Sequence, residues 1–346
     1  MMRLLTVAVF ACLAAFAAGD AVAKPVKKAA KAVRSAKAPA KATAPRESAH
    51  RKSPYVGAIS ADASTGKVLF EAGADVEAYP ASLTKLMTLF LVMEDVKAGK
   101  YTLNDRVSAT ADVRYSEASW VGIKEGEKMS VHDLCVALMV SSANDAAIML
   151  GVHASGSWTA FVERMNAQAA KLGMTHTKYY NPNGLPPTSS KGRSYPWKSF
   201  NVTTARDQLL LAKALLSRHS EVLDMTSVKT FDLVKTADGY RTSVTRRRNE
   251  PVKDTVLAEG EKNIISLRTH NNVMRTDKLK VVNPDGSEAI DGLKTGYIDA
   301  GGSSIVLTGR RGRKRIIVVV LGSATSKERD ANARRLFVDA LGAVTW

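Results

Sequence analysis

A serine and a lysine three residues apart, Ser82 and Lys85, are the first candidates for chemistry in this chain of 346 residues. They stand at the start of an apolar run, 83–93, that follows Pro80, and proline favours the first turn of a helix. Because the run is apolar on nearly every face, we expect a buried helix. A spacing of three stacks the hydroxyl and the amine on one helix face. We therefore predict that Ser82 is a nucleophile and Lys85 its base.

The same spacing occurs again at Ser64 and Lys67, so it does not identify a site by itself. This second copy falls in a glycine-containing turn, 62–66, between two short runs of β-forming residues. Water would surround both side chains there, and nothing would hold them together. We expect only the copy at the buried helix start to react.

A second candidate pair, Ser142 and Asn144, follows an apolar helix predicted over 131–140. A hydroxyl there can pass protons between Lys85 and a leaving amine, and the Asn144 amide can hold a substrate backbone. Ser199–Asn201 repeats the pattern in a polar loop, and such a pattern taken alone is more often a cap or a turn.

A third candidate is the strand pattern Gly292–Tyr297. Gly296 lets another backbone approach closely, as a peptide added to a sheet edge requires. Lys294 and Thr295 suit a carboxylate by charge and hydrogen bond. The structural alternative is an edge strand with a solubilising lysine.

The three patterns occur in the order that penicillin-binding proteins and class A β-lactamases share. From about Tyr55 onward the chain resembles the D-alanyl-D-alanine carboxypeptidases, low-molecular-mass penicillin-binding proteins of the serine peptidase type. Five segments carry the resemblance: 122–127, 142–147, 183–185, 203–207 and 291–296. One departure is Ala143, where the family usually has glycine between the serine and the asparagine.

The resemblance implies that Ser82 attacks the carbonyl of the penultimate D-Ala of a peptidoglycan stem peptide. Lys85 would take the proton of the Ser82 hydroxyl, and Ser142 would relay a proton to the departing D-Ala. The backbone N–H groups of Ser82 and Tyr297 would form the oxyanion hole. Burial and the nearby charge of Lys294 would both lower the pKa of Lys85, as a base requires.

The same resemblance implies that Thr295, with Arg329 on the last helix as its partner, holds the terminal carboxylate. Asn144, Lys294, Gly296 and Tyr297 complete the expected substrate-binding set. β-Lactams, which mimic D-Ala-D-Ala, would acylate Ser82. No cofactor is implied, and the six histidines show no metal-ligand spacing.

The element pattern predicts an α/β fold with three layers, αβα: an antiparallel sheet of about five strands flanked by helices, with a mostly helical insertion, like the β-lactamase and transpeptidase fold. Strands are expected at 55–60, 67–70, 292–297, 303–308 and 315–321, and a hairpin at 230–234 and 240–244. Helices are expected at 81–93, 131–140, 145–152, 158–172, 203–216 with Thr203 as its cap, and 326–341. The role of the charged stretch 228–264 stays open.

The first 23 residues have the pattern of a signal peptide: Arg3, an apolar run over 4–18, and small residues at 21–23. Residues 24–52 carry ten Lys or Arg against one Glu, which predicts a disordered basic tether. The tether is either a solvated spacer or a contact for anionic wall polymer or membrane surface, and export disfavours nucleic acid. We expect a periplasmic or secreted product without a transmembrane segment, whose peptidase domain spans 53–346.

Cleavage would remove Cys12 and leave Cys135, in an apolar run, as a buried core thiol. About fifty residues follow Lys294, which leaves no room for the extra β-domain and membrane anchor that many relatives carry.

Three rival functions remain. An endopeptidase acting on peptidoglycan cross-links would use the same residues. A class A β-lactamase needs a glutamate followed four residues later by asparagine, whereas the nearest candidate, Glu163, is followed by Ala167. A wall-binding protein with a vestigial site is the rival outside the enzymes.

Overall fold

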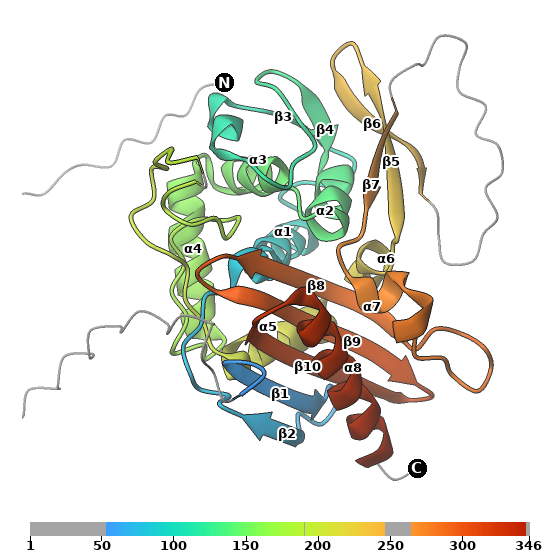
Figure 1. Ribbon diagram of the computed structural model, residues 1–346. Coiled ribbons are helices and arrows are strands. Elements are labelled where there is room, and N and C mark those ends of the chain that lie inside the picture. Colours follow the sequence, from blue (N-terminus) through green and yellow to red (C-terminus); the bar gives the residue numbers. More distant parts are fainter. Residues whose placement is uncertain (1–52, 190, 246–263, 344–346) are drawn as a thin grey trace, which may run out of the picture. The chain divides into compact units, whose positions relative to one another are not determined.

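Two strands from the beginning of the domain and three from its end form one antiparallel sheet (Figure 1). The computed structural model describes residues 53–189, 191–245 and 264–343. The order is β2-β1-β10-β9-β8. The bounds are β1 Gly57–Asp62, β2 Val68–Ala72, β8 Ile290–Ile298, β9 Gly302–Arg311 and β10 Lys314–Ser323. Gly57 lies opposite Leu321, so β1 and β10 join the two ends of the domain. The predicted signal peptide and tether, 1–52, lie outside the described residues.

Alternate side chains of β10 enter two different apolar cores, because successive residues of a strand face opposite sides of a sheet. Ile317 and Val319 belong to a core shared with the helices of the insertion. Ile316 and Val318 belong to a second core, shared with the last helix. That helix, α8 (Ser326–Ala343), lies across the sheet in Figure 1. The predicted three-layer αβα architecture is confirmed.

The segment between β2 and β8 is mostly helical, as predicted. Its helices are η2 Ala81–Thr84, α1 Lys85–Lys97, η3 Ala111–Tyr115, α2 Val131–Val140, α3 Asn144–Ser155, α4 Trp158–Lys171, α5 Ala205–Arg218, α6 Val222–Thr226, α7 Asn272–Arg275 and η4 Asp277–Leu279. The predicted cap of α5 was wrong by one residue: Thr204, not Thr203, accepts the N–H of Asp207. Within the described ranges no helix is long and apolar enough to cross a membrane.

The insertion also contains a second five-stranded sheet, ordered β3-β4-β6-β5-β7, which was not predicted. Its strands are β3 Arg106–Ser108, β4 Lys128–Ser130, β5 Thr230–Thr236, β6 Gly239–Thr245 and β7 Ile264–Arg268. The predicted hairpin is confirmed as β5 and β6, with Phe231 and Leu233 buried. Two residues after β7, the His270 N–H donates to the carbonyl of Val140, 3.3 Å away, at the end of α2. The charged stretch therefore leads back to the helix that precedes Ser142.

Candidate active site

The predicted nucleophile Ser82 lies in a 3-10 turn, η2, from which α1 continues at Lys85. The expected α-helix start at Ala81 is therefore a tighter turn. Lys85 Nζ and Ser82 Oγ are 2.9 Å apart, so the two side chains are in hydrogen-bond contact. Lys85 is fully buried, whereas Ser82 keeps partial exposure. The turn thus presents the hydroxyl to solvent and hides the amine behind it.

The backbone of this turn is held in a strained shape by close neighbours. Ala81 has φ +48°, a left-handed conformation that is costly for a residue with a Cβ. Gly184, with φ +87°, packs so closely on it that a Cβ at Gly184 would overlap the Ala81 carbonyl oxygen. A Cβ at Gly296 would lie 2.7 Å from the Pro80 carbonyl oxygen. The close backbone approach that was predicted at Gly296 is therefore made by the turn that carries Ser82.

Lys85 has three hydrogen-bond partners, and none of them is charged. Besides Ser82, they are Asn144 Oδ1 at 2.7 Å and the carbonyl of Asn183 at 2.6 Å. Burial lowers the pKa of Lys85 well below its usual value, and the charge of Lys294 lowers it further, whereas Asp145 opposes the shift. The surroundings therefore favour the neutral amine, the form that accepts a proton.

Asn144 was predicted to bind substrate, and its amide is already engaged at both ends. Oδ1 accepts from Lys85, and Nδ2 donates to the Glu117 carbonyl at 2.6 Å. Its neighbour Asp145 accepts the N–H groups of Val121, Gly122 and Ile123 at 2.9 to 3.1 Å. These contacts fix the loop 117–123 over the start of α3. Asn144 is thus placed to orient Lys85.

Ser142 has φ +61° and is 3% exposed, in the turn between α2 and α3. Its Oγ has no hydrogen-bond partner in the part of the chain that the structure describes. A buried hydroxyl without a partner is destabilising, so a group supplied by a ligand would satisfy it. The geometry leaves this hydroxyl available for the predicted proton relay.

The strand β8 carries the other predicted residues. Lys294 is buried, its Nζ donates to the carbonyl of Thr295 at 3.0 Å, and burial together with the charge of Arg329 lowers the pKa of Lys294 to about 7. Thr295 is buried beside it, whereas the Tyr297 side chain is exposed and its hydroxyl donates to Asp299 at 2.7 Å. Arg329, on α8, is buried against Asp330. These groups make a cationic side of the site.

Sequence reasoning missed two groups that support the site: the Asn183 carbonyl, which accepts from Lys85, and the Asp145 carboxylate, which binds the loop 121–123. The signal for the first was the turn 181–185, in which the Asn181 side chain accepts the Gly184 N–H at 2.6 Å. Asparagine that holds its own turn is a common turn device. Asn183 and Asp145 both fall in segments that carried the family resemblance, but no role was predicted for either residue.

The second serine-asparagine pattern has a structural role. Asn201 is buried, and its Nδ2 donates to Thr84 Oγ1 at 2.9 Å and to the Asn181 carbonyl at 3.0 Å. It therefore supports the Asn181 turn from behind.

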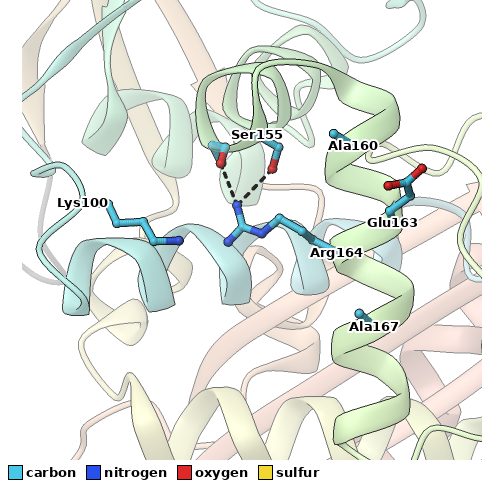
Figure 2. Close-up of a pocket in the computed structure, with 7 residues that line it drawn as sticks. Lys100, Ser155, Ala160, Glu163, Arg164 and Ala167 are labelled. Atoms are coloured by element: carbon cyan, nitrogen blue, oxygen red, sulfur yellow. Dashed lines mark hydrogen bonds between the residues drawn. The ribbon is translucent and has the colours of Figure 1, made fainter. Parts of the chain in front are cut away.

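Glu163, the candidate for a β-lactamase-like mechanism, lies on α4 in a separate cavity of about 530 Å³ with Lys100 and Arg164 (Figure 2). Lys100 follows the far end of α1, which at Lys97 is about 18 Å from Lys85 at 1.5 Å per residue. Glu163 is therefore too far from Ser82 to activate a water molecule there.

Cys135 is buried as predicted, and burial raises the pKa of its thiol to about 12, which makes it unreactive. Among the residues with a described position, no group of three or more His, Cys, Asp or Glu side chains could hold a metal ion.

Comparison with known proteins gives one family. The model of D-alanyl-D-alanine carboxypeptidases matches residues 50–269. The chain is 31% identical to D-alanyl-D-alanine carboxypeptidase DacC of Escherichia coli over 284 residues, 80% of this chain and 59% of the relative. It is 34% identical to a D-alanyl-D-alanine endopeptidase of Pseudomonas aeruginosa over 174 residues, 49% of this chain and 51% of the relative. The chain thus spans about 60% of the length of the curated relatives it matches.

Two solved structures are similar throughout the domain. The D-alanyl-D-alanine carboxypeptidase DacD from Francisella tularensis matches with a TM-score of 0.71 and 26% identity, over 87% of this chain and 73% of that one. Penicillin-binding protein D2 from Listeria monocytogenes, in its ampicillin-bound form, matches with a TM-score of 0.60 and 29% identity, over 83% of this chain and 97% of that one.

Proposed function

This chain belongs to the D-alanyl-D-alanine carboxypeptidase family, and from that premise we propose that it is a serine carboxypeptidase that removes the terminal D-Ala from peptidoglycan stem peptides. One observation carries the proposal: a fully buried lysine, in contact with the Ser82 hydroxyl, has only neutral hydrogen-bond partners. Burial favours the neutral form of such a lysine, which can accept a proton, and the serine beside it is the proton donor.

Acylation begins with Lys85 neutral. Its two N–H groups then donate to Asn144 Oδ1 and the Asn183 carbonyl, and its lone pair accepts the Ser82 O–H across the 2.9 Å contact. As Ser82 Oγ bonds to the carbonyl carbon of the penultimate D-Ala, its proton passes to Lys85 Nζ. The backbone N–H groups of Ser82 and Tyr297 stabilise the oxyanion, and loss of such a donor typically costs on the order of a hundredfold in rate.

The leaving group must then be protonated. The amine of the terminal D-Ala receives its proton from Lys85 through Ser142, whose Oγ has no partner of its own among the described residues. The C–N bond breaks and leaves an acyl ester on Ser82, which water hydrolyses with Lys85 again taking the proton. β-Lactams form the same ester and block the site.

The terminal carboxylate of the substrate binds on the cationic side, at Lys294, Thr295 and Arg329. This supports a preference for substrates with a free carboxylate next to the scissile bond. No cofactor takes part in these steps.

The location of the enzyme belongs to the same proposal. Residues 1–23 act as a signal peptide, and 24–52 tether the peptidase domain, 53–346, near anionic wall or membrane surfaces in the periplasm. Both segments lie outside the described residues, so the sequence pattern alone supports their assignment.

A direct test is release of D-Ala from purified pentapeptide muropeptides, measured by chromatography of the products. We expect conversion of pentapeptide to tetrapeptide at neutral pH and its suppression by prior incubation with penicillin. If pentapeptide stays intact while penicillin labels the protein, the carboxypeptidase assignment is wrong.

The endopeptidase reading is the second candidate, favoured by the 34% identity to the Pseudomonas aeruginosa endopeptidase. It uses the same acylation, with the amine of a cross-link as leaving group. Cross-linked dimeric muropeptides in the same assay decide between the two: cleavage to monomers faster than loss of D-Ala from pentapeptides would establish the endopeptidase.

A further inference from the structure

The guanidinium expected to meet the substrate carboxylate is already held by a buried acid. Arg329 Nε and Nη2 donate to Asp330 Oδ1 at 2.8 and 2.7 Å. Both residues are almost fully buried, at 4% and 1% exposure. In the described part of the chain no hydrogen bond joins Nη1 to another group. One edge of the guanidinium is therefore fixed, and one nitrogen is left for a ligand.

The acid is held in turn from the far side of the site. Asp330 Oδ2 accepts from Asn272 Nδ2 at 3.2 Å, while Asn272 Oδ1 accepts from Arg275 Nη2 at 2.6 Å. Asn272 begins α7, four residues after β7 ends the second sheet. A chain of side chains thus runs from the exit of the charged stretch to Arg329.

Electrostatics explains why the acid is needed. Burial lowers the pKa of His270 to about 4, and the charges of Lys294, Lys85, Arg275 and Arg329 contribute to the shift, so five basic groups share this corner of the site. Arg329 also lowers the pKa of Lys294. Without Asp330, a buried guanidinium would face other cations with no counterion, which is strongly unfavourable.

We propose that Asp330, fixed by Asn272, is the positioning residue of the carboxylate subsite: it holds Arg329 so that Nη1 meets the carboxylate next to the scissile bond. The inference rests on the proposed function, and it gives the charged stretch a role in substrate recognition through α7. The alternative is that the pair only stabilises the packing of α8 on the sheet.

A measurement of peptide binding separates the positioning role from the packing role without requiring catalysis. In a Ser82→Ala background, the dissociation constants of an acetylated Lys-D-Ala-D-Ala peptide and of its C-terminal amide are measured by calorimetry. We expect the free acid to bind at least tenfold more tightly than the amide. Adding Asp330→Asn should reduce this preference about tenfold, the low end of what a hydrogen bond to a charged group is worth. Asn272→Ala should reduce it less, about threefold, because Asn272 acts only through Asp330.

The matched control is Asp339→Asn, which removes another carboxylate from α8. Asp339 pairs with Arg335 at 3.1 Å on the exposed face, so the preference should stay unchanged. Asp330→Asn should also have no further effect on the preference when Arg329→Ala is present, because one residue acts through the other. An unchanged acid preference in Asp330→Asn, or full additivity with Arg329→Ala, would overturn the proposal.

A pH profile adds a readout that packing alone would not move. The penicillin acylation rate of the otherwise wild-type protein should fall as the pH rises through about 7, where Lys294 loses its proton. The charged or titratable groups around Lys294 are the side chains of Lys85, His270, Arg275, Arg329, Asp145 and Asp330. Asp330→Asn should move this fall to lower pH, because Arg329 then repels Lys294 more, and Arg329→Ala should move it to higher pH.

Failure of this inference differs from failure of the proposed function. If the preference for the free-acid peptide depends on Asp330 but the wild type releases no D-Ala, the carboxylate subsite is supported and the carboxypeptidase activity is refuted. Absence of acid preference in the Ser82→Ala parent would overturn the inference even if D-Ala is released.

Discussion

The chain contains the same serine-lysine spacing twice, and the two copies differ in burial and in hydrogen-bond partners. At Ser64 the hydroxyl donates to Asp62 Oδ1 at 2.5 Å in an exposed turn, and Lys67 extends into solvent. At Ser82 the spacing lies on the turn into α1, and the lysine is buried. The Ser64 hydroxyl donates its proton to a carboxylate, whereas the Ser82 hydroxyl contacts a buried lysine. The difference shows that reactivity depends on what surrounds the pair.

The far end of α1 sharpens this point. Asp95 is buried there as deeply as Lys85, but Arg164 and Lys100 both pair with it, at 2.8 and 2.7 Å. Figure 2 shows Arg164 also donating toward Ser155 from α4. A buried charge with ionic partners stabilises packing, whereas a buried amine with neutral acceptors is prepared for proton transfer.

Removing each hydroxyl in turn gives the largest contrast. Ser82→Ala should abolish covalent labelling by fluorescent penicillin, because the other hydroxyl of the turn, Thr84, is buried and hydrogen-bonded to Asn201. Ser64→Ala should label like the wild type. The measurement is gel fluorescence after a fixed incubation, with peptide mapping of the adduct. Equal labelling of Ser82→Ala and wild type would refute the assignment of the nucleophile.

Removing each lysine gives a smaller, graded contrast. Lys85→Ala should slow acylation by about 10²- to 10⁴-fold, the usual contribution of a general base, while Lys67→Ala has no effect. In the wild type the acylation rate should rise with pH as Lys85 loses its proton. The midpoint should lie well below the usual lysine pKa, because burial and Lys294 stabilise the neutral amine. Stopped-flow acylation across pH measures both; a midpoint at the ordinary lysine value would contradict the electrostatic argument.

The smallest contrast tests the backbone that supports the reactive copy. Gly184→Ala would overlap the Ala81 carbonyl and displace Ser82, so we expect acylation to slow about tenfold, within the roughly hundredfold loss that a misplacement of about 1 Å can cause. Gly173→Ala is the matched control, since Gly173 has a similar φ of +75° with nothing near the site of a Cβ. Both variants share the backbone strain, so a thermal melt should fall in both. Equal acylation rates in the two variants would show that the contact with Ala81 does not position the nucleophile.

The central sheet was predictable because its strands are long and strongly apolar. The runs at 303–308 and 315–321 identified β9 and β10 without any knowledge of their partners. The second sheet was not predicted for the opposite reason. β3 and β4 have three residues each, too few for a periodic pattern, and β4 joins β6 only through the single pair Lys128 and Gly239. Such pairing is tertiary information.

For the site, the sequence indicated which residue types gather but not which atoms meet. Ser82 and Lys85 are close in the chain, so helical geometry was enough to pair them. Asn144 was assigned to substrate, whereas its amide contacts Lys85 and Glu117, because nothing in a local pattern shows what lies opposite. The pair of Arg329 and Asp330 is adjacent in sequence, yet Asp330 also accepts a hydrogen bond from Asn272, 58 residues away.

The hydrogen bonds of Lys85 also set the time at which the serine becomes reactive. Two of its acceptors are 59 and 98 residues away along the chain, and Lys294 is supplied by β8, near the end of the domain. Contacts this distant form late, because long loops must close first. Until they form, Lys85 stays solvated and protonated, and Ser82 is an ordinary hydroxyl. We therefore expect labelling of Ser82 by penicillin to report that these long-range contacts of Lys85 have formed.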